Sequence, residues 1–261
     1  MSAELILAHV LGQRRLDVLI RPESELGPAQ AEELRWLVRR RGRGEPVAYI
    51  LGQKEFYGRQ FQIDPRALIP RPETEHLVDL CKSLPAVQDG GKAADICAGC
   101  GNLGVTLCCE FPGLQCILAD ISTSALSLAR ENAGLHFVSE RTLCTCQHLA
   151  EGISSSSLDL AVCNPPYVPQ EELDELSREV AGFEPRIALD GGSRGTEAAL
   201  AAANSIAAAL KPGGHLLLET GWDQARQIQA HLSEQPTPWA QIHCHYDLQG
   251  HPRVVSAEKV S

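Results

Sequence analysis

The feature that most restricts the fold of this chain is an alternation of short apolar segments with helical patterns from residue 93 onward. Apolar runs of this length are typical of buried strands, and the segments between them have the apolar spacing of helices. Strands joined through helices run parallel, so the pattern predicts a parallel, doubly wound α/β sheet. The predicted strands are 93–97, 115–119, 142–146, 158–163 and 215–219, and the predicted helices lie near 103–110, 122–133 and 194–210.

The two ends of the chain follow other patterns. Residues 239–247 and 252–258 flank Gly250-His251-Pro252 and predict a hairpin that closes the sheet in antiparallel fashion. Near the amino terminus, the residues from Leu5 to Val10 and those after Pro28 have helical spacing, and a third short helical pattern ends at Gly52.

A hairpin is predicted over residues 55–63, because two short strand patterns flank a glycine turn. Prolines at positions 70 and 72 make the next segment rigid and extended, and it leads into a helix that Thr74 is predicted to cap. The predicted organisation is a helical substrate-recognition module (1–53), a β-hairpin with a linker helix (54–92) and an α/β domain (93–261), with Gln88–Lys92 as the linker.

Charge and composition narrow the partners. The 33 Asp and Glu residues outnumber the 23 Lys and Arg residues, and the net charge of −10 repels polyphosphate, so we expect no stable nucleic-acid complex. We interpret the basic cluster Arg39–Arg43 as the last turn of a helix, with contact to RNA as the alternative. No apolar run approaches the roughly 18 residues of a membrane span, and the amino terminus has no signal-peptide pattern. We therefore expect a cytoplasmic monomer.

The ten cysteines are expected to be reduced in that compartment. Cys97 and Cys100 have the spacing of a redox or zinc pair, but no second pair follows at a zinc-ribbon distance. His243 and His245 share a strand face without a further ligand nearby. No metal site is predicted.

A glycine-rich turn follows the first strand of the α/β domain. Asp95 lies in the strand, and Gly99, Gly101 and Gly104 follow it, so the backbone can bend sharply and approach a ligand closely. The second strand ends at Asp120, which is placed to accept hydrogen bonds from both hydroxyls of a ribose. The pattern predicts a nucleoside-containing cofactor at the carboxyl ends of the strands.

The glycines also match the dinucleotide fingerprint, so an NAD-dependent oxidoreductase is one alternative. Asp95 favours S-adenosylmethionine instead, because a carboxylate there can hold the ammonium group of a methionine tail but would repel a pyrophosphate. A second feature is Asn164-Pro165-Pro166-Tyr167 at the end of the fourth strand. The two prolines end the strand and fix the backbone, which holds Asn164 and Tyr167 at the ligand edge of the sheet.

Together these motifs resemble class I amino-methyltransferases that act on planar amide or exocyclic amine nitrogens. Within that group the chain resembles the HemK/PrmC glutamine methyltransferases of peptide chain release factors. That resemblance runs from about residue 3 to the end, starting about one helix later than is usual in the family. It rests on residues 45–52, on Leu68-Ile69-Pro70-Arg71-Pro72-Glu73-Thr74-Glu75, on residues 183–192 and on the closing 247–253.

The resemblance implies a class I, Rossmann-like methyltransferase fold with a small helical amino-terminal domain. It also implies S-adenosylmethionine as the cofactor and a release-factor glutamine, in a Gly-Gly-Gln motif, as the acceptor. In this family the asparagine side chain and the first proline's carbonyl accept hydrogen bonds from the two N–H groups of the target amide. The implied catalytic residues are Asn164, Pro165 and Tyr167, and Pro166 joins them in substrate binding. The implied cofactor residues are Asp95, Cys97, Ala98, Gly99, Cys100, Gly101, Asp120, His148, Leu149 and Asn164.

The sequence departs from the family after the third strand, where an acidic residue usually lies near the adenine. Here Gln147 or His148 would bond the base and Leu149 would pack on it. For Arg71 and Glu73 two interpretations stay open: an ion-paired strut between domains, or a segment that places Leu68 and Thr74 over the pocket. The remaining alternatives for the whole chain are a DNA or RNA adenine amino-methyltransferase and a non-catalytic cofactor-binding scaffold.

Overall fold

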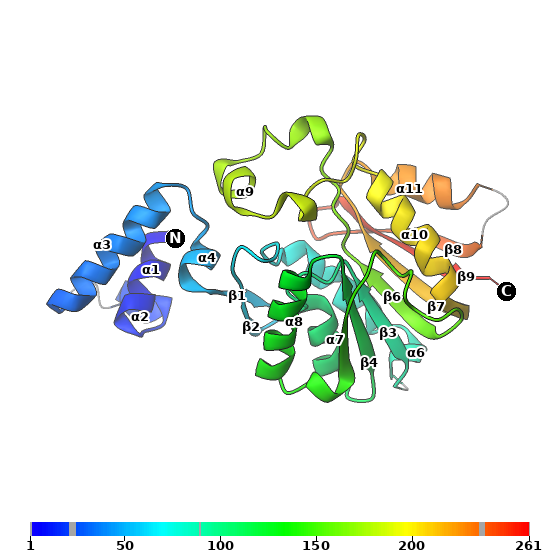
Figure 1. Ribbon diagram of the computed structural model, residues 1–261, viewed down its shortest axis with the longest axis horizontal. Coiled ribbons are helices and arrows are strands. Elements are labelled where there is room, and N and C mark those ends of the chain that lie inside the picture. The colour runs from blue at the N-terminus through cyan, green and yellow to red at the C-terminus, as the bar shows by residue number, and fades with distance from the viewer. Residues whose placement is uncertain (1, 21–24, 89, 235–237, 261) are drawn as a thin grey trace.

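A seven-stranded sheet forms the centre of the protein, in the order β5-β4-β3-β6-β7-β9-β8 (Figure 1). The computed structural model describes residues 2–20, 25–88, 90–234 and 238–260. The strands from β5 to β7 run parallel, and β9 pairs antiparallel with β7 and β8, which confirms the predicted fold class. The strands are β3 (Lys92–Ile96), β4 (Gln115–Asp120), β5 (Thr142–Cys146), β6 (Leu158–Cys163), β7 (Leu210–Glu219), β8 (Trp239–Tyr246) and β9 (Pro252–Lys259).

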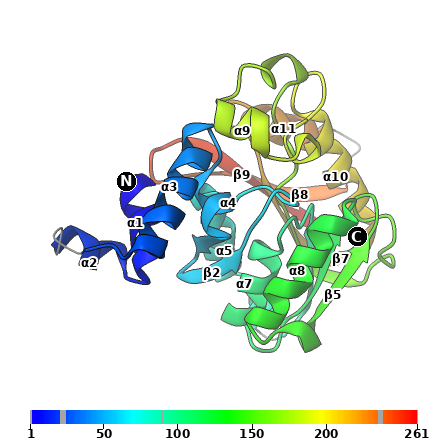
Figure 2. The same cartoon turned by 60° about the vertical axis from the view of Figure 1, so that its left-hand side comes forward.

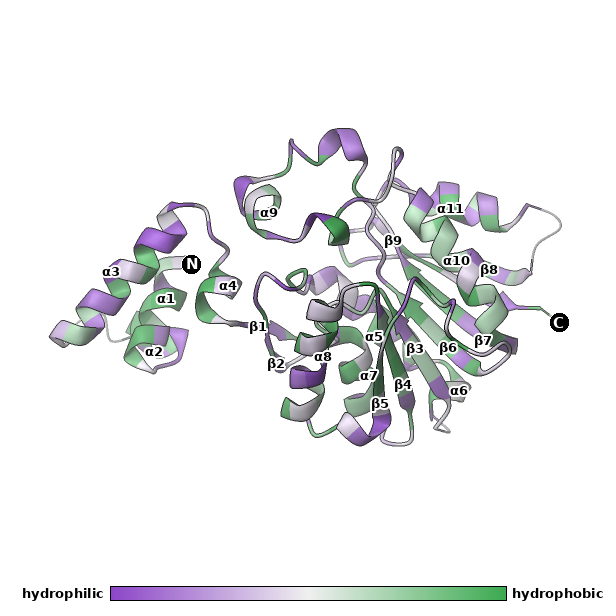
Figure 3. Ribbon diagram, viewed as in Figure 1, coloured by the Kyte–Doolittle hydropathy of each residue, from purple (hydrophilic) through white to green (hydrophobic). Residues whose placement is uncertain are grey.

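Helices cover both faces of this sheet, as a parallel sheet requires. Because side chains alternate along a strand, Ala93 packs with α5, α7 and α8, while Ala94 packs with α10 and α11. Figure 3 shows the central strands coloured as apolar along much of their length. The helices are α5 (Glu75–Cys81), α6 (Pro85–Gln88), α7 (Asn102–Glu110), α8 (Thr123–Leu135), α9 (Arg178–Phe183), α10 (Glu197–Ala209) and α11 (Ala225–Leu232).

The amino-terminal helices have a small core of their own, formed by Ile6, Val10, Leu37 and Ile50. Figures 1 and 2 both show them at one side of the molecule, joined to the sheet through α4 and a hairpin. The elements are α1 (Ser2–Leu11), α2 (Arg15–Ile20), α3 (Pro28–Gly42), α4 (Val47–Leu51) and the hairpin strands β1 (Gln53–Phe56) and β2 (Arg59–Gln62).

Tyr49 fastens this part to the rest of the protein. Its hydroxyl donates a 2.7 Å hydrogen bond to the Ala67 carbonyl, and its ring packs with Ile63 and Leu128. The interpretation of the basic cluster as a helix end is confirmed, because α3 ends at Gly42 and its last turn holds Arg39, Arg40 and Arg41.

One prediction about local structure needs correction. Thr74 stands at the N-cap position of α5, as expected, but it also ends a 3₁₀ turn (Pro72–Thr74) and its side chain makes no capping hydrogen bond. Helices α2, α6, α9 and α11 were not predicted. Part of the predicted linker, residue 89, lies outside the described residues, and β3 already begins at Lys92. No helix in the described part of the chain is long and apolar enough to cross a membrane.

Close contact between α7 and the sheet depends on Gly104. A Cβ atom at this position would lie 2.3 Å from Leu118 Cδ2 and 3.0 Å from Asp95 Cβ, and both of those side chains are buried. We expect Gly104→Ala to lower the free energy of unfolding by about 1–3 kcal/mol in a urea titration, because overpacking strains the core.

The matched control is Gly182→Ala in α9, where a Cβ atom would meet nothing within 4 Å. Alanine is the better helix former, so this variant should equal the parent or be more stable by up to about 1 kcal/mol. Equal urea midpoints for Gly104→Ala and the parent would contradict the packing argument.

Candidate active site

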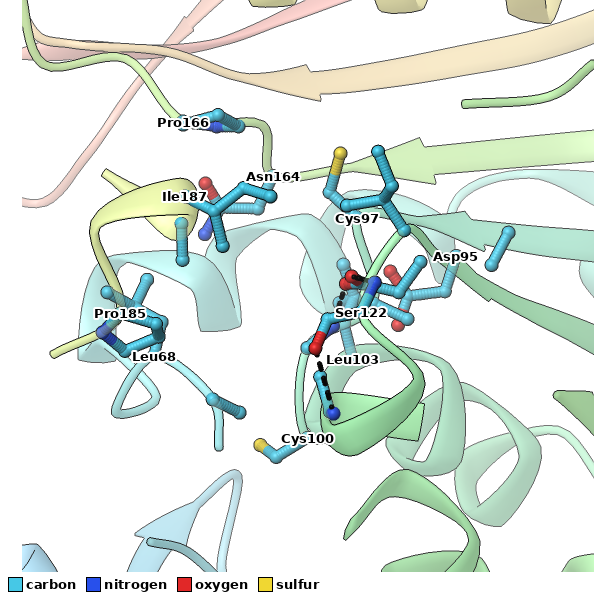
Figure 4. A pocket seen from close by; sticks show the side chains of 18 of the residues that line it. Leu68, Asp95, Cys97, Cys100, Leu103, Ser122, Asn164, Pro166, Pro185 and Ile187 are labelled. Carbon is cyan, nitrogen blue, oxygen red and sulfur yellow. Dashed lines mark hydrogen bonds between the residues drawn. The ribbon is translucent and has the colours of Figure 1, made fainter. Parts of the chain in front are cut away.

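A cavity of about 280 Å³ lies at the carboxyl ends of the parallel strands. This is the edge where doubly wound sheets bind ligands, and the volume is near the lower end of the roughly 300–1,000 Å³ of small-molecule sites. Figure 4 shows Leu68 and Pro185 on the opposite side of the cavity from Asp95. The predicted site residues that line it are Asp95, Cys97, Ala98, Gly99, Cys100, Asp120, His148, Leu149, Asn164 and Pro166.

The turn between β3 and α7 forms the floor of this cavity. Cys97, Gly99 and Gly101 have φ angles of 62°, 55° and 78°, in the left-handed region that favours glycine. A Cβ atom at Gly99 would meet no protein atom within 4 Å, so the open side of this turn faces space that a ligand can enter. Gly101 does not line the cavity; it begins α7 and lies against Ala129.

Asp95 is a buried acid in the wall of the cavity, with an exposed fraction of 2%. The Gly104 N–H donates a 2.8 Å hydrogen bond to its Oδ2. Burial raises the pKa of Asp95 to about 7, because desolvation outweighs this hydrogen bond. No cationic group within the described ranges offsets the burial, so a ligand cation at this carboxyl group would be favourable.

Asp120 stands at the end of β4, where backbone donors orient its carboxyl group. The Gly99 N–H donates to Oδ2 at 2.9 Å, and the Ser122 N–H donates to Oδ1 at 2.8 Å. Each carboxylate oxygen can accept a further hydrogen bond, so both remain able to bind hydroxyl groups. Burial raises the pKa of Asp120 above its ordinary value.

The loop after β5 contains the three residues considered for contact with a base, Gln147, His148 and Leu149, and only two of them reach the cavity. His148 and Leu149 line the cavity, and His148 Nδ1 lies 3.0 Å from Glu151 Oε1. Gln147 does not line it: its Nε2 donates to the Leu149 carbonyl at 2.8 Å and its side chain borders a different pocket. The structure therefore favours His148 and Leu149 over Gln147.

Asn164 follows β6 directly and lines the cavity, and its side-chain Nδ2 donates a 3.1 Å hydrogen bond to Thr74 Oγ1. Among the described residues, no protein donor is hydrogen-bonded to Asn164 Oδ1 or to the Pro165 carbonyl. The described part of the protein occupies neither acceptor, and of these two residues Asn164 lines the cavity.

Pro165 is buried and Tyr167 is half-buried, and neither belongs to the cavity lining. Burial is the main cause of the raised pKa of Tyr167, and its backbone carbonyl accepts a 2.8 Å hydrogen bond from Gln224. The burial of Pro165 and the Gln224–Tyr167 hydrogen bond fix the Asn-Pro-Pro-Tyr segment on the side away from the cavity.

The segment before α5 forms the opposite wall. Arg71 forms an ion pair with Glu184 at 2.7 Å, not with Glu73, and Glu184 also accepts a 3.0 Å hydrogen bond from the Ile69 N–H. Leu68 and Thr74 both line the cavity, so this segment serves as a strut and as a wall. The sequence analysis did not include Ser122, Pro185 or Ile187 in the site; the last two lie in the 183–192 motif, which was the signal for them.

The cysteines do not form a joint site. The Cys100 thiol donates a hydrogen bond to Asn102 Oδ1 at 3.3 Å, whereas Cys97 lies beside Cys163. No cluster of metal-ligating side chains occurs within the described ranges.

This combination defines the class of protein. A parallel sheet with a glycine turn and an acid after β4 fits a nucleoside, and the buried, unpaired Asp95 fits an ammonium group and not a pyrophosphate. The protein is an S-adenosylmethionine-dependent methyltransferase. Of the solved structures, TrmN from Thermus thermophilus shares the fold, with a TM-score of 0.51 and 19% identity over 72% of this chain and 48% of that one.

Sequence comparisons narrow the class further. The PrmC N-terminal domain matches residues 1–52, and the methyltransferase small domain matches residues 76–180. A release factor glutamine methyltransferase from Nitratidesulfovibrio vulgaris is 39% identical over 99% of this chain and 88% of its own length. Another from Koribacter versatilis is 36% identical over 99% of this chain and 91% of its own length. The chain belongs to the release factor glutamine methyltransferase family.

The buried state of Asp95 predicts a pH-dependent affinity for S-adenosylmethionine. With a pKa of about 7, the carboxyl group is largely protonated below that pH and must lose its proton to pair with the ammonium group. We therefore expect binding to weaken as the pH falls below 7 and to release protons near pH 7. Calorimetry in two buffers of different ionisation enthalpy measures this release.

Asp95→Asn should bind roughly ten- to a hundredfold more weakly, since a hydrogen bond to a charged group contributes about 1.5–3 kcal/mol, and should release no proton. Asp159→Asn is the matched control, because Asp159 pairs with Lys211 and lies outside the cavity lining. Proton release that persists in Asp95→Asn would contradict the assignment.

Proposed function

We propose that this protein transfers the methyl group of S-adenosylmethionine to the side-chain amide nitrogen of a glutamine in a peptide chain release factor, in its Gly-Gly-Gln motif. The observation that carries the proposal is a pair of neighbouring acceptors directly after β6, Asn164 Oδ1 and the Pro165 carbonyl, to which no donor among the described residues is hydrogen-bonded. A primary amide has two N–H bonds on one nitrogen, so two acceptors suit it. Family membership supports the same acceptor.

An amide nitrogen is a weak nucleophile because its lone pair is delocalised into the carbonyl group. Asn164 Oδ1 and the Pro165 carbonyl accept hydrogen bonds from the two N–H groups. These hydrogen bonds draw electron density onto the nitrogen and aim its lone pair into the cavity. As positive charge develops on the nitrogen these hydrogen bonds strengthen, so they stabilise the transition state more than the ground state. When bound, S-adenosylmethionine supplies an electrophilic methyl group. No side chain has to remove a proton first, because methyl transfer would leave a cationic amide nitrogen that carries the new methyl group and both hydrogens, and this cation readily loses one proton to water.

The remaining residues of the proposed site hold and align the reactants. Asp95 binds the ammonium group and Asp120 the ribose hydroxyls, while the backbone of Cys97, Ala98, Gly99 and Cys100 shapes the floor. His148 and Leu149 contact the base. Pro166 borders the acceptor, and Tyr167 packs behind it and excludes water. Alignment of this kind supplies most of the rate enhancement when no acid or base takes part.

The proposal assigns recognition of the release factor to residues 1–53, the hairpin and linker to 54–92, and catalysis to 93–261. One copy of the chain acts without nucleic acid, because all groups of the proposed site come from a single chain and the net charge is −10. The cytoplasm is the implied location, since translation ends there.

Methylation of an adenine amino group is the alternative, because an exocyclic amine can use the same two acceptors. The negative charge of the chain opposes a nucleic-acid substrate. Similarity to release factor glutamine methyltransferases also supports the amide over the base.

The test measures label transfer from S-adenosylmethionine to a purified release factor, to the same factor with its motif glutamine changed to alanine, and to duplex DNA. We expect label on the intact factor alone. Asn164→Ala should lower kcat by about a hundredfold or more, because one of the two hydrogen bonds that strengthen in the transition state is lost.

Asn164→Ala should still bind S-adenosylmethionine within a fewfold of the parent, which separates a lost acceptor contact from a lost fold. Label on DNA alone would replace the proposed acceptor with adenine. Label on the alanine variant of the factor would show that another residue is the target.

A further inference from the structure

The proposed chemistry requires one particular orientation of the Asn164 side chain. Its amide group has an oxygen end and an NH₂ end of nearly equal size, and only the oxygen can accept an N–H bond from the substrate. If the group turned by 180°, the NH₂ end would face the substrate's N–H bonds and repel them. Some contact must therefore distinguish the two ends.

Thr74 makes that contact. Its side chain has an exposed fraction of 3%, and its Oγ1 accepts the 3.1 Å hydrogen bond from Asn164 Nδ2, which leaves Asn164 Oδ1 available. A threonine hydroxyl can donate as well as accept, so Thr74 alone would satisfy either orientation of the amide. The direction of its O–H bond has to be fixed from its other side.

Glu219 lies on that side. It is the last residue of β7, its exposed fraction is 2%, and its carboxyl group lies close enough to the Thr74 side chain for that hydroxyl to favour the ionised form. The Oε2 atom has no hydrogen-bond partner among the described residues. A buried acid with an unpartnered oxygen is costly to stability, which points to a role in the site.

We propose that Thr74 and Glu219 are positioning residues that orient the Asn164 amide for the acceptor, an inference that rests on the proposed function. An ionised carboxylate can only accept hydrogen bonds, so Glu219 accepts one from the Thr74 hydroxyl group. Thr74 Oγ1 can then only accept from Asn164, and this contact turns Nδ2 away from the substrate and Oδ1 toward it. Three elements cooperate: β7, the turn before α5 and the end of β6.

Protonation of Glu219 would remove this constraint. A protonated carboxyl group can donate a hydrogen bond to Thr74 Oγ1. The Thr74 hydroxyl can then donate its own hydrogen to Asn164 Oδ1, so both orientations of the Asn164 amide have a hydrogen-bond partner. The charged and titratable groups that interact electrostatically with Glu219 are Arg71 and Glu73 from the turn before α5, Arg253 from β9, Cys163 from β6, and Tyr167 after β6. Burial dominates among these influences and raises the pKa of Glu219 to about 7, so the constraint weakens as the pH falls through that value.

A first experiment reads the orientation without any methyl acceptor. In the ¹⁵N-labelled full chain, the Asn164 side-chain amide signal is identified by its loss in Asn164→Asp and followed from pH 5.5 to 8.5. We expect its chemical shift to titrate with a midpoint near 7 in the parent and in Thr74→Ser. The titration should be absent in Thr74→Val and in Glu219→Gln.

A second experiment measures kcat at saturating S-adenosylmethionine, so that Asp95 does not contribute through binding. Thr74→Val has the shape of threonine without its hydroxyl, and it should lower kcat about tenfold or more with a near-parent KM for the cofactor. Thr74→Ser should stay within about threefold of the parent. Glu219→Gln should lower kcat severalfold and remove the decline of the parent's kcat below pH 7.

The outcomes separate this inference from the proposed function. If the parent methylates no glutamine, the proposed function fails, and the amide titration still decides the orientation. A parent signal that does not titrate, or one that titrates equally in Glu219→Gln, overturns the inference, as does a parent-like kcat in Thr74→Val. Equal urea midpoints for the Thr74 variants confirm that the comparison concerns folded protein.

Discussion

The parallel pairing of β3 with both β4 and β6 is the constraint on which the site depends. In this register Ile96 lies beside Ala119 on one side and beside Cys163 on the other. The three strands therefore end at one edge, and the next residues along the chain are Cys97 of the glycine turn, Asp120 and Asn164. A shift of one residue in either pairing would turn Asp95 to the opposite face of the sheet, away from Gly104.

Burial gives these groups their chemistry. The apolar packing that stabilises the sheet also removes water from Asp95 and Glu219, so both acids have pKa values of about 7. The two differ in what compensates the buried charge. Asp95 faces the cavity, where a ligand ammonium group can pair with it, whereas Glu219 lies outside the cavity lining, beside Thr74. We therefore propose different roles for the two acids at this edge of the sheet: cofactor binding for Asp95 and positioning of Asn164 for Glu219.

Much of this arrangement could be predicted from the sequence because it is encoded locally. Strand-helix alternation predicted the sheet, and the glycine turn and Asn-Pro-Pro-Tyr predicted its ligand edge. The contacts of Thr74 could not be predicted, because its partner Asn164 is 90 positions away and a threonine before a helix has the local pattern of a cap. The ion pair between Arg71 and Glu184 could not be predicted for the same reason: the two residues are 113 positions apart, and Glu73 is the acid closer to Arg71 in the sequence. Gln147 and His148 are adjacent polar residues, and only the backbone after β5 decides which one reaches the cavity.

In the proposed mechanism, Asn164 Oδ1 and the Pro165 carbonyl accept hydrogen bonds from the two N–H groups of a glutamine amide. The most direct measurement is a crystal structure of the full chain with S-adenosylhomocysteine and a peptide that contains Gly-Gly-Gln. We expect the glutamine amide nitrogen to lie within hydrogen-bond distance, about 2.7–3.2 Å, of both Asn164 Oδ1 and the Pro165 carbonyl, and to face the cofactor's sulfur. A glutamine bound with its carbonyl oxygen toward Asn164, or bound outside the cavity, would contradict it.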